Sequence, residues 1–332
     1  MQSPTPRVSI GLPVYNGARF LAAALDSILG QSFDDFELIV SDNASTDATP
    51  EICRHFAERD SRVRYVRNET NLGGARNFSN VFGLARGEYF KWASHDDVMA
   101  PDFLARCVEA LDADPSVILC FSRMRVIGPD GFEKKSDFSN DLRELDSTQP
   151  SARFGDLVLT GHGCFHVWGV MRREDAAETP LIADYIGSDR GFLAELALRG
   201  RFRELSEDLF SLRDHPGRSV RAMPFYLRAE WFDPPRMGKR VFPHWRLWIE
   251  YARSLRRVEL ATSERARCAL LLLRWPIGRF NWARLAMDLV VGVAPGAWRM
   301  HLRVRGWYRG VRRRVPIGRT ARPLRRPRGG LT

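Results

Sequence analysis

Short apolar segments alternate with segments of helical periodicity over the first 127 residues of this 332-residue chain. Residues 8–14 have the pattern of a buried strand, and residues 18–30 repeat apolar side chains at the spacing of one helix face. Strands and helices of this length in alternation imply parallel βαβ units. The sequence therefore predicts an α/β fold with a doubly wound sheet. Further strands are predicted at 36–41, 62–66, 88–92 and 117–127, with helices at 49–59, 74–86 and 101–112.

The second half of the chain is less regular. A polar, turn-rich loop is predicted first, and a segment of glycine, histidine and aromatic residues lies at 161–171. A helix with an apolar stripe is predicted at 187–200, and the compact domain is expected to end near residue 216. Seven of the nine tryptophans lie beyond that point, between 231 and 307. The predicted units are a domain at 1–216 with halves 1–127 and 128–216, a Trp-rich helical extension at 217–298, and an Arg-rich tail at 299–332.

Positive charge is concentrated at the C-terminal end. The net charge of the chain is +11, and residues 299–332 hold twelve arginines with no Asp, Glu or Lys. About −1 is left for residues 1–298, so the body of the protein is close to neutral. A tail of this kind attracts anionic surfaces, either lipid or nucleic acid.

The five cysteines have no paired spacing. This is typical of buried thiols in a reducing compartment, and it argues against a disulfide framework or a zinc site. No signal peptide is apparent at residues 1–7, and no apolar run reaches the roughly 18 residues that span a bilayer. We therefore expect a cytoplasmic protein.

Two adjacent carboxylates, Asp96 and Asp97, follow the strand predicted at 88–92. Like charges at this spacing repel each other, and a divalent cation with its preference for oxygen ligands would relieve the repulsion. Open α/β sheets bind their ligands at this edge. The alternative is an Asp-rich loop that caps the helix after Pro101. The other strand ends favour a metal-diphosphate site.

Polar loops follow the other predicted strands of the N-terminal half. They lie at 13–17 and 41–47, and a third, at 71–77, opens a helix on the same rim. Asp42 could accept a hydrogen bond from a base imide, and the small residues of the third loop permit close approach of a ligand to backbone N–H groups. Asp47 is interpreted as a helix cap. Neither a Walker motif nor G-x-G-x-x-G is present, which excludes the usual ATPase and dinucleotide fingerprints.

These motifs together resemble the family 2 glycosyltransferases, which have the GT-A fold. The resemblance is carried by VSIGLPVYNGARFL, FELIVSDNASTDAT, NETNLGGARNFSN and GEYFKWASHDDVMAPDFL, in that order. It is close over residues 7 to about 110 and looser over 160–215. It implies a mixed GT-A sheet and transfer of a sugar from a nucleotide-sugar, usually with inversion and with Mg²⁺ or Mn²⁺.

The resemblance also assigns donor-site residues. Asp42 falls where a uracil-binding carboxylate is expected, which favours a UDP-sugar, and Asp96 falls on the metal-binding second Asp of the D-x-D motif. Ser94 replaces the first Asp of that motif, which puts its contact with the donor ribose or the metal water shell in doubt. The residues expected to bind the nucleotide-sugar are Pro13, Tyr15, Asn16, Asp42, Asn43, Asn71, Gly73, Asn77, Ser94, His95, Asp97 and Arg213.

Catalytic chemistry is assigned to the second half of the chain. The family places an acidic residue at the start of a helix beneath the acceptor site, and Asp189 fits that description as the base. Asp184 is the competing choice, and simple capping of the helix is the structural alternative. His215 falls where some GT-A enzymes add a further metal ligand, although an exposed histidine often has no such role.

Residues 245–257 place Trp245, Trp248 and Ile249 on one helical face and Glu250 among the arginines of the other. This composition suits an interfacial membrane helix or a subdomain packed on the sheet, and both alternatives stay open.

The resemblance leads us to expect a glycan or lipid-linked acceptor and a role in cell-surface polysaccharide or glycolipid synthesis. We also expect an anionic membrane surface as a partner, at the inner face of the cytoplasmic membrane; nucleic acid is disfavoured because no recognition motif accompanies the arginines. The rival functions are a nucleotidyltransferase and a non-catalytic polybasic scaffold. The first would need a glycine-rich phosphate loop after the first strand, and residues 13–17 lack one.

Overall fold

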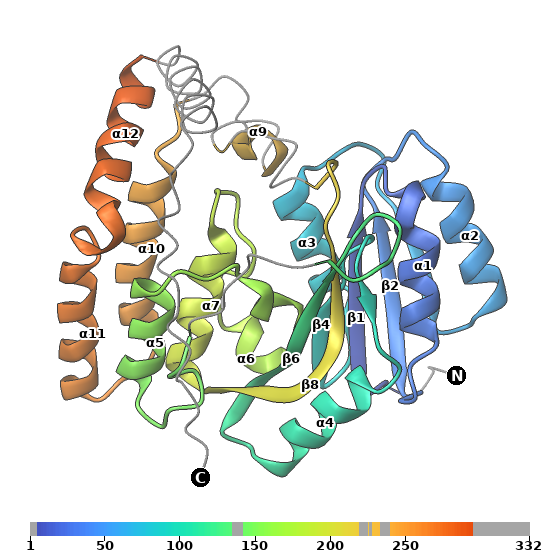
Figure 1. Cartoon of the computed structure of the whole chain (residues 1–332), viewed down its shortest axis with the longest axis horizontal. Coiled ribbons are helices and arrows are strands. Elements are labelled where there is room, and N and C mark those ends of the chain that lie inside the picture. The colour runs from blue at the N-terminus through green and yellow to red at the C-terminus, as the bar shows by residue number, and fades with distance from the viewer. Residues whose placement is uncertain (1–4, 135–141, 219–224, 226–227, 233–239, 295–332) are drawn as a thin grey trace, which may run out of the picture.

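The computed structural model describes residues 5–134, 142–218, 225, 228–232 and 240–294. Its strands are β1 (Val8–Val14), β2 (Phe36–Asp42), β3 (Val63–Arg67), β4 (Tyr89–Trp92), β5 (Val98–Met99), β6 (Val117–Ile127), β7 (Val170–Arg172) and β8 (Arg201–Arg213). They form one mixed sheet in the order β3-β2-β1-β4-β7-β6-β8-β5 (Figure 1). The predicted doubly wound α/β sheet is confirmed.

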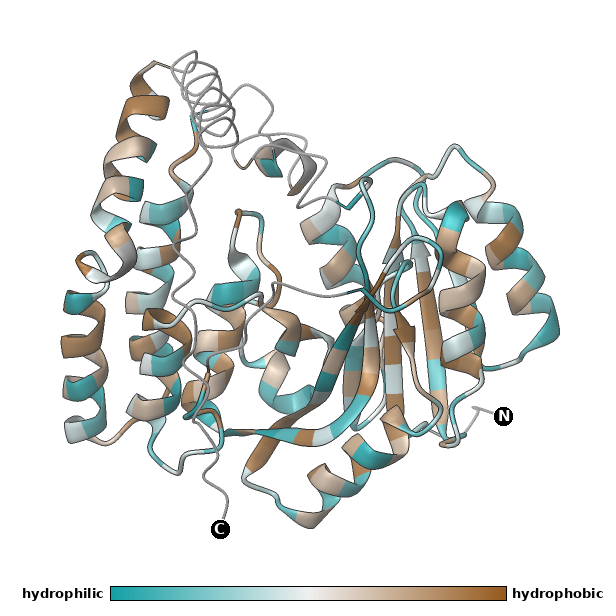
Figure 2. Cartoon of the chain, viewed as in Figure 1, coloured by the Kyte–Doolittle hydropathy of each residue, from teal (hydrophilic) through white to brown (hydrophobic). Residues whose placement is uncertain are grey.

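Helices cover both faces of this sheet (Figure 1). One face packs against α1 (Ala18–Leu29), α2 (Thr49–Arg59) and α4 (Phe103–Ala113), and the other against α3 (Gly74–Gly83), α5 (Pro150–Leu159), α6 (Arg173–Ala177) and α7 (Ser188–Arg199). Leu21 and Phe103 belong to the first core, and Val81 and Phe192 to the second. The central strands between them are largely apolar (Figure 2), as parallel strands buried on both faces must be.

The strand directions bring several strand ends to one edge. Val14 of β1 pairs with Asp42 of β2, and Gly11 pairs with Trp92 of β4, all in parallel. β7 is antiparallel to both β4 and β6, so β6 again runs in the direction of β4, and β8 pairs parallel with β6. The carboxyl ends of β1, β2, β4, β6 and β8 therefore share one rim of the sheet.

The C-terminal helices pack mainly on α5 and α7. They are α9 (Arg228–Phe232), α10 (Pro243–Arg257), α11 (Thr262–Arg274) and α12 (Asn281–Val293). A third core joins Tyr251 of α10 and Cys268 of α11 to Phe154 of α5 and Leu198 of α7. None of the helices in the described residues is long and apolar enough to cross a membrane. The Arg-rich tail predicted at 299–332 lies outside the described residues.

The predicted faces of α10 need correction. Ile249, expected on the apolar face, is 41% exposed, whereas Glu250, expected on the polar face, is 7% exposed. Glu250 is buried because Arg253 donates to it at 2.6 Å and Arg257 lies 3.5 Å away. Arg257 also donates to Glu195 of α7 at 2.6 Å. Part of the interface between α10 and α7 is therefore formed by charged side chains, at positions where the apolar periodicity of α10 predicts a solvent-exposed face.

Candidate active site

Hydrogen bonds tie the loop after β1 to the loop after β2. Asn16 has φ 51°, a left-handed conformation that Asn tolerates better than most residues. Its backbone N–H donates to the Ser45 hydroxyl at 2.9 Å, and its Oδ1 accepts from the Thr46 N–H at 2.8 Å. Pro13 is buried within β1, whereas Tyr15 is 40% exposed at the rim. Asn16 therefore shapes the rim, and Tyr15 is available to a ligand.

Asp42 is fully buried at the end of β2. Its Oδ2 accepts from the Tyr65 hydroxyl at 2.9 Å and from Arg67 Nη1 at 3.0 Å, and its Oδ1 accepts from the Ser45 N–H at 2.8 Å. Burial and the hydrogen bond to Asp42 raise the pKa of Tyr65 to about 12, so this phenol stays a donor at neutral pH. The carboxylate is therefore held in one orientation, and its role as a uracil ligand stays a prediction.

Side-chain amides hold the loop before α3. Asn43 Nδ2 donates to Asn71 Oδ1 at 2.8 Å, and Asn71 Oδ1 also accepts from the Gly73 N–H at 2.9 Å. Gly73 has φ 86°, which L side chains rarely adopt. Asn77 exchanges hydrogen bonds with Ser41 at the end of β2, at 2.6 and 2.9 Å. The four predicted donor-site residues in this region thus belong to one network that positions the N-terminus of α3.

The structure brings Asp96 and His215 together from positions 119 residues apart. His215 Nε2 lies 2.9 Å from Asp96 Oδ2, and the Ser94 hydroxyl donates to Asp96 Oδ1. Burial by itself would raise the pKa of Asp96, but His95, Ser94 and His215 together bring it below its ordinary value. Asp96 is therefore a carboxylate at neutral pH, with an imidazole nitrogen beside it.

Asp97 and Arg213 support the turn that carries Asp96. The Arg213 N–H donates to Asp97 Oδ1 at 2.8 Å, and Arg213 Nε donates to the backbone oxygen of Asp96 at 2.9 Å. Burial, with Asp96 adding to it, raises the pKa of Asp97 to about 7. Both residues are buried, so they hold the backbone of the Asp96 turn against the end of β8.

Aromatic and imidazole rings close the space between this turn and α1. A Cβ on Gly17 would lie 2.7 Å from His95 Cδ2, so the close approach of His95 to the first loop requires glycine there. Phe20 packs on the His215 ring at 4.7 Å between centroids, and Arg213 lies 4.9 Å from the centroid of Phe20. The loops after β1, β4 and β8 are thereby packed together.

The Asp96 and His215 side chains fit a divalent cation by their donor chemistry, since carboxylate oxygens and imidazole nitrogens both ligate Mn²⁺-type ions. Within the described part of the chain, no group of three or more His, Cys, Asp or Glu side chains is arranged to hold a metal. Mg²⁺ at phosphate substrates is held by one or two carboxylates, while phosphates and water complete the shell, so Asp96 could supply the carboxylate of such a site.

Asp189 is the second residue of α7, which follows Gly187 at φ 86°. Its Oδ1 accepts from the N–H of Arg190 at 2.9 Å, and Arg190 Nη2 in turn donates to the backbone oxygen of His162 at 2.6 Å. Asp189 is partly exposed, whereas Ser188 beside it is buried. The predicted helix start is confirmed in place, and the assignment of Asp189 as base stays a prediction.

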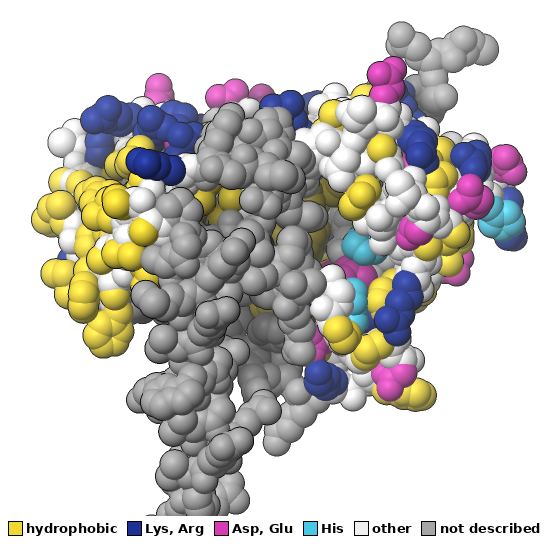
Figure 3. Space-filling view, turned by 90° about the horizontal axis from the view of Figure 1, so that it is seen from above, with side chains coloured by type: hydrophobic (Ala, Val, Ile, Leu, Met, Phe, Trp, Pro, Cys, Tyr) yellow, Lys and Arg dark blue, Asp and Glu magenta, His cyan; other side chains and the backbone are white. Residues whose placement is uncertain are grey.

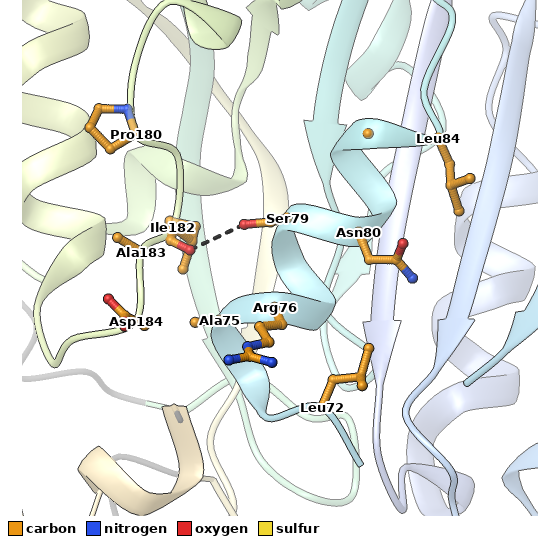
Figure 4. Close-up of a pocket in the computed structure, with 11 residues that line it drawn as sticks. Leu72, Ala75, Arg76, Ser79, Asn80, Leu84, Pro180, Ile182, Ala183 and Asp184 are labelled. Carbon is orange, nitrogen blue, oxygen red and sulfur yellow. Dashed lines mark hydrogen bonds between the residues drawn. The ribbon is translucent and has the colours of Figure 1, made fainter. Parts of the chain in front are cut away.

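Asp184 lies in the loop before α7 and faces a groove of about 690 Å³ along α3. Figure 4 shows Asp184 and Ile182 on the loop side and Arg76 and Ser79 on the α3 side. The Ser79 hydroxyl donates across the groove to the backbone oxygen of Ile182 at 3.3 Å. This hydrogen bond joins the donor half of the sheet to the loop that precedes the candidate base.

Comparison with known families identifies the family of this chain. The family described as "Glycosyl transferase family 2" matches residues 9–178, just over half of the chain. The chain belongs to glycosyltransferase family 2. This confirms the resemblance and the enzyme class that the sequence predicts.

Two named relatives are glycosyltransferases. The putative glycosyltransferase EpsH of Bacillus subtilis is 24% identical over 64% of this chain and 56% of its own length. Glycosyltransferase GlyG of Streptococcus pneumoniae is 35% identical over 32% of this chain and 36% of its own length. The chain thus spans between about a third and somewhat over half of these relatives.

Solved structures confirm the GT-A fold over more of the chain. TarS 1–349 of S. aureus aligns with a TM-score of 0.60 at 16% identity, over 87% of this chain and 81% of that one. Mannosyltransferase PcManGT of Pyrobaculum calidifontis aligns with a TM-score of 0.53 at 21% identity, over 91% of this chain and 81% of that one. Identities this low establish the fold alone.

Two residues at the rim, Tyr65 and Arg67, were missed from sequence. Both contact Asp42, and Arg67 Nη2 also donates to the backbone oxygen of Ser45 at 2.9 Å. The sequence did contain a signal: the alternation of strands and helices predicts that β3 is parallel to β2, so the end of β3 should reach the same rim, as it does. A Tyr-x-Arg pair at such a strand end is a candidate partner for an acidic neighbour.

Proposed function

We propose that this protein transfers a sugar from a nucleoside-diphosphate sugar to a hydroxyl of a glycan or lipid-linked acceptor, by a single displacement with inversion. The observation that carries the proposal is the pairing of Asp96 with His215 at a rim where the ends of β1, β2 and β4 meet. Cell-surface polysaccharide or glycolipid synthesis is the proposed setting, with an anionic membrane surface as partner.

The donor assignment draws support from two structural neighbours. TarS has been solved with UDP-GlcNAc, and PcManGT with GDP-Man and Mn²⁺. We favour a UDP-sugar and assign the base to the end of β2, where Tyr65 and Arg67 orient the Asp42 carboxylate. Tyr15, 40% exposed on the same rim, is placed to pack on the base.

Asp96 and His215 would hold the Mg²⁺ or Mn²⁺ ion. When bound, such an ion neutralises the charge that develops on the departing nucleoside diphosphate. Ser94 orients Asp96 through its hydroxyl, and Arg213 fixes the backbone of the same turn. These contacts preorganise the turn, so that little rearrangement is needed when the donor binds.

Asp189 is the proposed base. Its place at the N-terminus of α7 leaves its carboxylate partly exposed. In the reaction it would accept the proton of the attacking acceptor hydroxyl, which requires that hydroxyl within hydrogen-bond reach. Inversion follows, because the acceptor attacks the face of the sugar opposite the diphosphate.

The test is a panel of nucleotide-sugars with Mn²⁺, read first as thermal stabilisation and then as turnover, since a ligand of the native state raises its apparent stability. Asp96→Asn should abolish turnover and leave the melting temperature of the free protein nearly unchanged. Asp35→Asn is the matched control, because Asp35 is an exposed carboxylate before β2. Turnover that persists with a chelator present would exclude the metal-dependent mechanism.

A further inference from the structure

A second cavity, of about 400 Å³, lies between the loop before α7 and the C-terminal helices. The loop contributes Asp184 and Tyr185, and α9 contributes Ala229. The remaining wall comes from the start of α10 and from Leu289 of α12. Its volume falls in the range of ordinary small-molecule sites.

One part of the cavity is basic and aromatic. Arg240 is exposed at its edge, and Arg246 lies over the Tyr185 ring, 5.5 Å from the centroid. Arg246 Nε is 3.3 Å from Glu250, which fixes its position, and Trp245 lines the cavity next to it. The side chains that line the cavity include two arginines and one carboxylate, Asp184, so this part of the cavity favours an anion.

The other part of the cavity is apolar and open to solvent. Phe242 is 37% exposed, Ile249 is 41% exposed and Leu289 is 50% exposed, although all three are large hydrophobic side chains. The apolar surface continues along α12 through Val290 and Val293, which are 51% and 76% exposed. Figure 3 shows hydrophobic side chains gathered at this side of the molecule, at the left of the view. An exposed patch of this kind marks an interaction site for apolar groups.

The cavity also adjoins the candidate base. A Cβ on Gly191, in the first turns of α7, would overlap the hydroxyl of Tyr185, so this lining residue touches the helix that carries Asp189. Burial, and after it charges that include Asp189, raise the pKa of Tyr185. Arg228, next to the lining residue Ala229, is also within electrostatic reach of Asp189. A ligand in the cavity would thus lie beside the start of α7.

We propose that this cavity binds the lipid part of the acceptor, in which a phosphate-type anionic group joins an apolar chain to the glycan that carries the attacking hydroxyl. Arg240 and Arg246 would bind the anionic group, and Phe242, Ile249 and Leu289 would bind the first part of the chain, which continues over α12 toward the bilayer. The acceptor role rests on the proposed function. Residues 299–332 follow α12 in sequence and hold twelve arginines, whose charge favours binding to the anionic surface of the bilayer that would contain the lipid.

The test is calorimetric titration of the full chain with decyl phosphate below its micellar concentration. Two comparison ligands separate the parts of the proposal: inorganic phosphate carries only the anion, and decyl maltoside carries the same chain on a neutral head. We expect decyl phosphate to bind at least about tenfold more tightly than either, since a charged contact and a buried chain each contribute about that factor. Equal affinity for decyl phosphate and either comparison ligand would overturn the proposal.

Variants locate the binding. Arg240→Glu should weaken decyl phosphate by about tenfold and leave decyl maltoside unchanged, and Arg256→Glu, an exposed arginine at the far end of α10, is the matched control. Leu289→Asp should weaken both amphiphiles, whereas Leu273→Asp, 67% exposed on α11, should weaken neither. If Leu289→Asp and Leu273→Asp lower the affinity for the amphiphiles equally, the apolar binding is not confined to the cavity. If Arg240→Glu does not lower the affinity for decyl phosphate, the cavity has no anion subsite at Arg240. Either result overturns the proposal.

The same titrations are run with UDP and Mn²⁺ in place of the amphiphiles. Arg240→Glu and Leu289→Asp should leave UDP affinity unchanged, because neither residue lies on the rim that carries Asp42 and Asp96. If UDP and GDP both fail to bind, the proposed function fails, and the amphiphile titrations still decide whether the cavity takes a lipid phosphate.

Discussion

Lys91 offers a test of how strongly the core of this fold perturbs a charge. It lies on β4, fully buried, and its ammonium group donates to the backbone oxygens of Trp92, at 3.2 Å, and of Trp168. The rings of Phe103 and Phe210 lie 4.7 and 5.3 Å from Nζ. Burial lowers the pKa of Lys91 to about 7, against smaller opposing effects of Cys107 and Asp97.

The sign of the effect on stability follows from proton binding. Between about pH 7 and pH 10.5 the unfolded chain holds a proton on Lys91 that the folded chain lacks, so the free energy of unfolding rises with pH in this window. The slope approaches about 1.4 kcal/mol per pH unit for one proton. Below the window both states are protonated and above it both are neutral, so the contribution is flat. Lys91→Met removes the slope.

Two measurements check this prediction. The chain has four lysines, so ¹³C-labelled lysine gives a resolvable NMR titration in which one signal has its midpoint near pH 7. That signal should be absent from Lys91→Met. In urea unfolding, the wild type should gain about 2 to 3 kcal/mol on Lys91→Met between about pH 7.5 and pH 9.5. Lys134→Met is the control for the slope: Lys134 is 49% exposed, so the variant loses the ion pair with Asp214 but should keep the wild-type rise of stability with pH.

Parallel stability curves for the wild type and Lys91→Met, or a Lys91 signal that titrates only above about pH 9.5, would refute the reasoning. Either result would mean that the two backbone oxygens and the two rings keep the ammonium group charged inside the core.

Three further predictions concern the site and the tail. Asp42→Asn should weaken UDP binding by about tenfold and UDP more than GDP, by calorimetry; equal affinity of the wild type for both nucleotides would remove Asp42 as a uracil ligand. Asp189→Asn should lower turnover by about 10²-fold or more with donor affinity unchanged, and full activity would shift the assignment to Asp184. Truncation after residue 298 should weaken binding to anionic vesicles at low salt, because each arginine near the leaflet contributes about 1 kcal/mol. Full-length protein that stays free of such vesicles contradicts the membrane partner.

The strands that sequence predicted best are those buried on both faces. β1 and β2 are buried along their whole length and consist mainly of apolar residues, as a parallel central strand requires, and their bounds agree closely with prediction. β5 and β7, of two and three residues, were missed because no periodicity can develop over so short a length. β8 was not predicted as a strand, since its polar residues obscure the strand pattern over most of its 13 residues.

The candidate site was predictable where it depends on strand ends. The placement of Asp42 and Asp96 follows from the βαβ order alone. The meeting of Asp96 with His215 came only from family resemblance, because local periodicity carries no information about contacts 119 residues apart. The predicted buried face of α10 was wrong for a related reason. Glu250 is buried beside Arg257, which also donates to Glu195 of α7, and local periodicity cannot predict a contact with another helix.

The ion pair between Arg257 and Glu195 has a consequence for how this protein can be divided. Glu195 is 1% exposed on the helix that carries Asp189, and its partner arginine comes from α10. A shortened protein that stops after β8 would lose Arg257, leave Glu195 with Arg199 at 3.5 Å, and expose the apolar residues of α5 and α7 that pack on α10 and α11. The domain boundary near residue 216 stays a prediction, and the packing of α10 on α7 argues against independent folding of residues 1–216. A minimal active protein should retain at least α10, and the part of the fold around α7 is expected to mature only after that helix has left the ribosome.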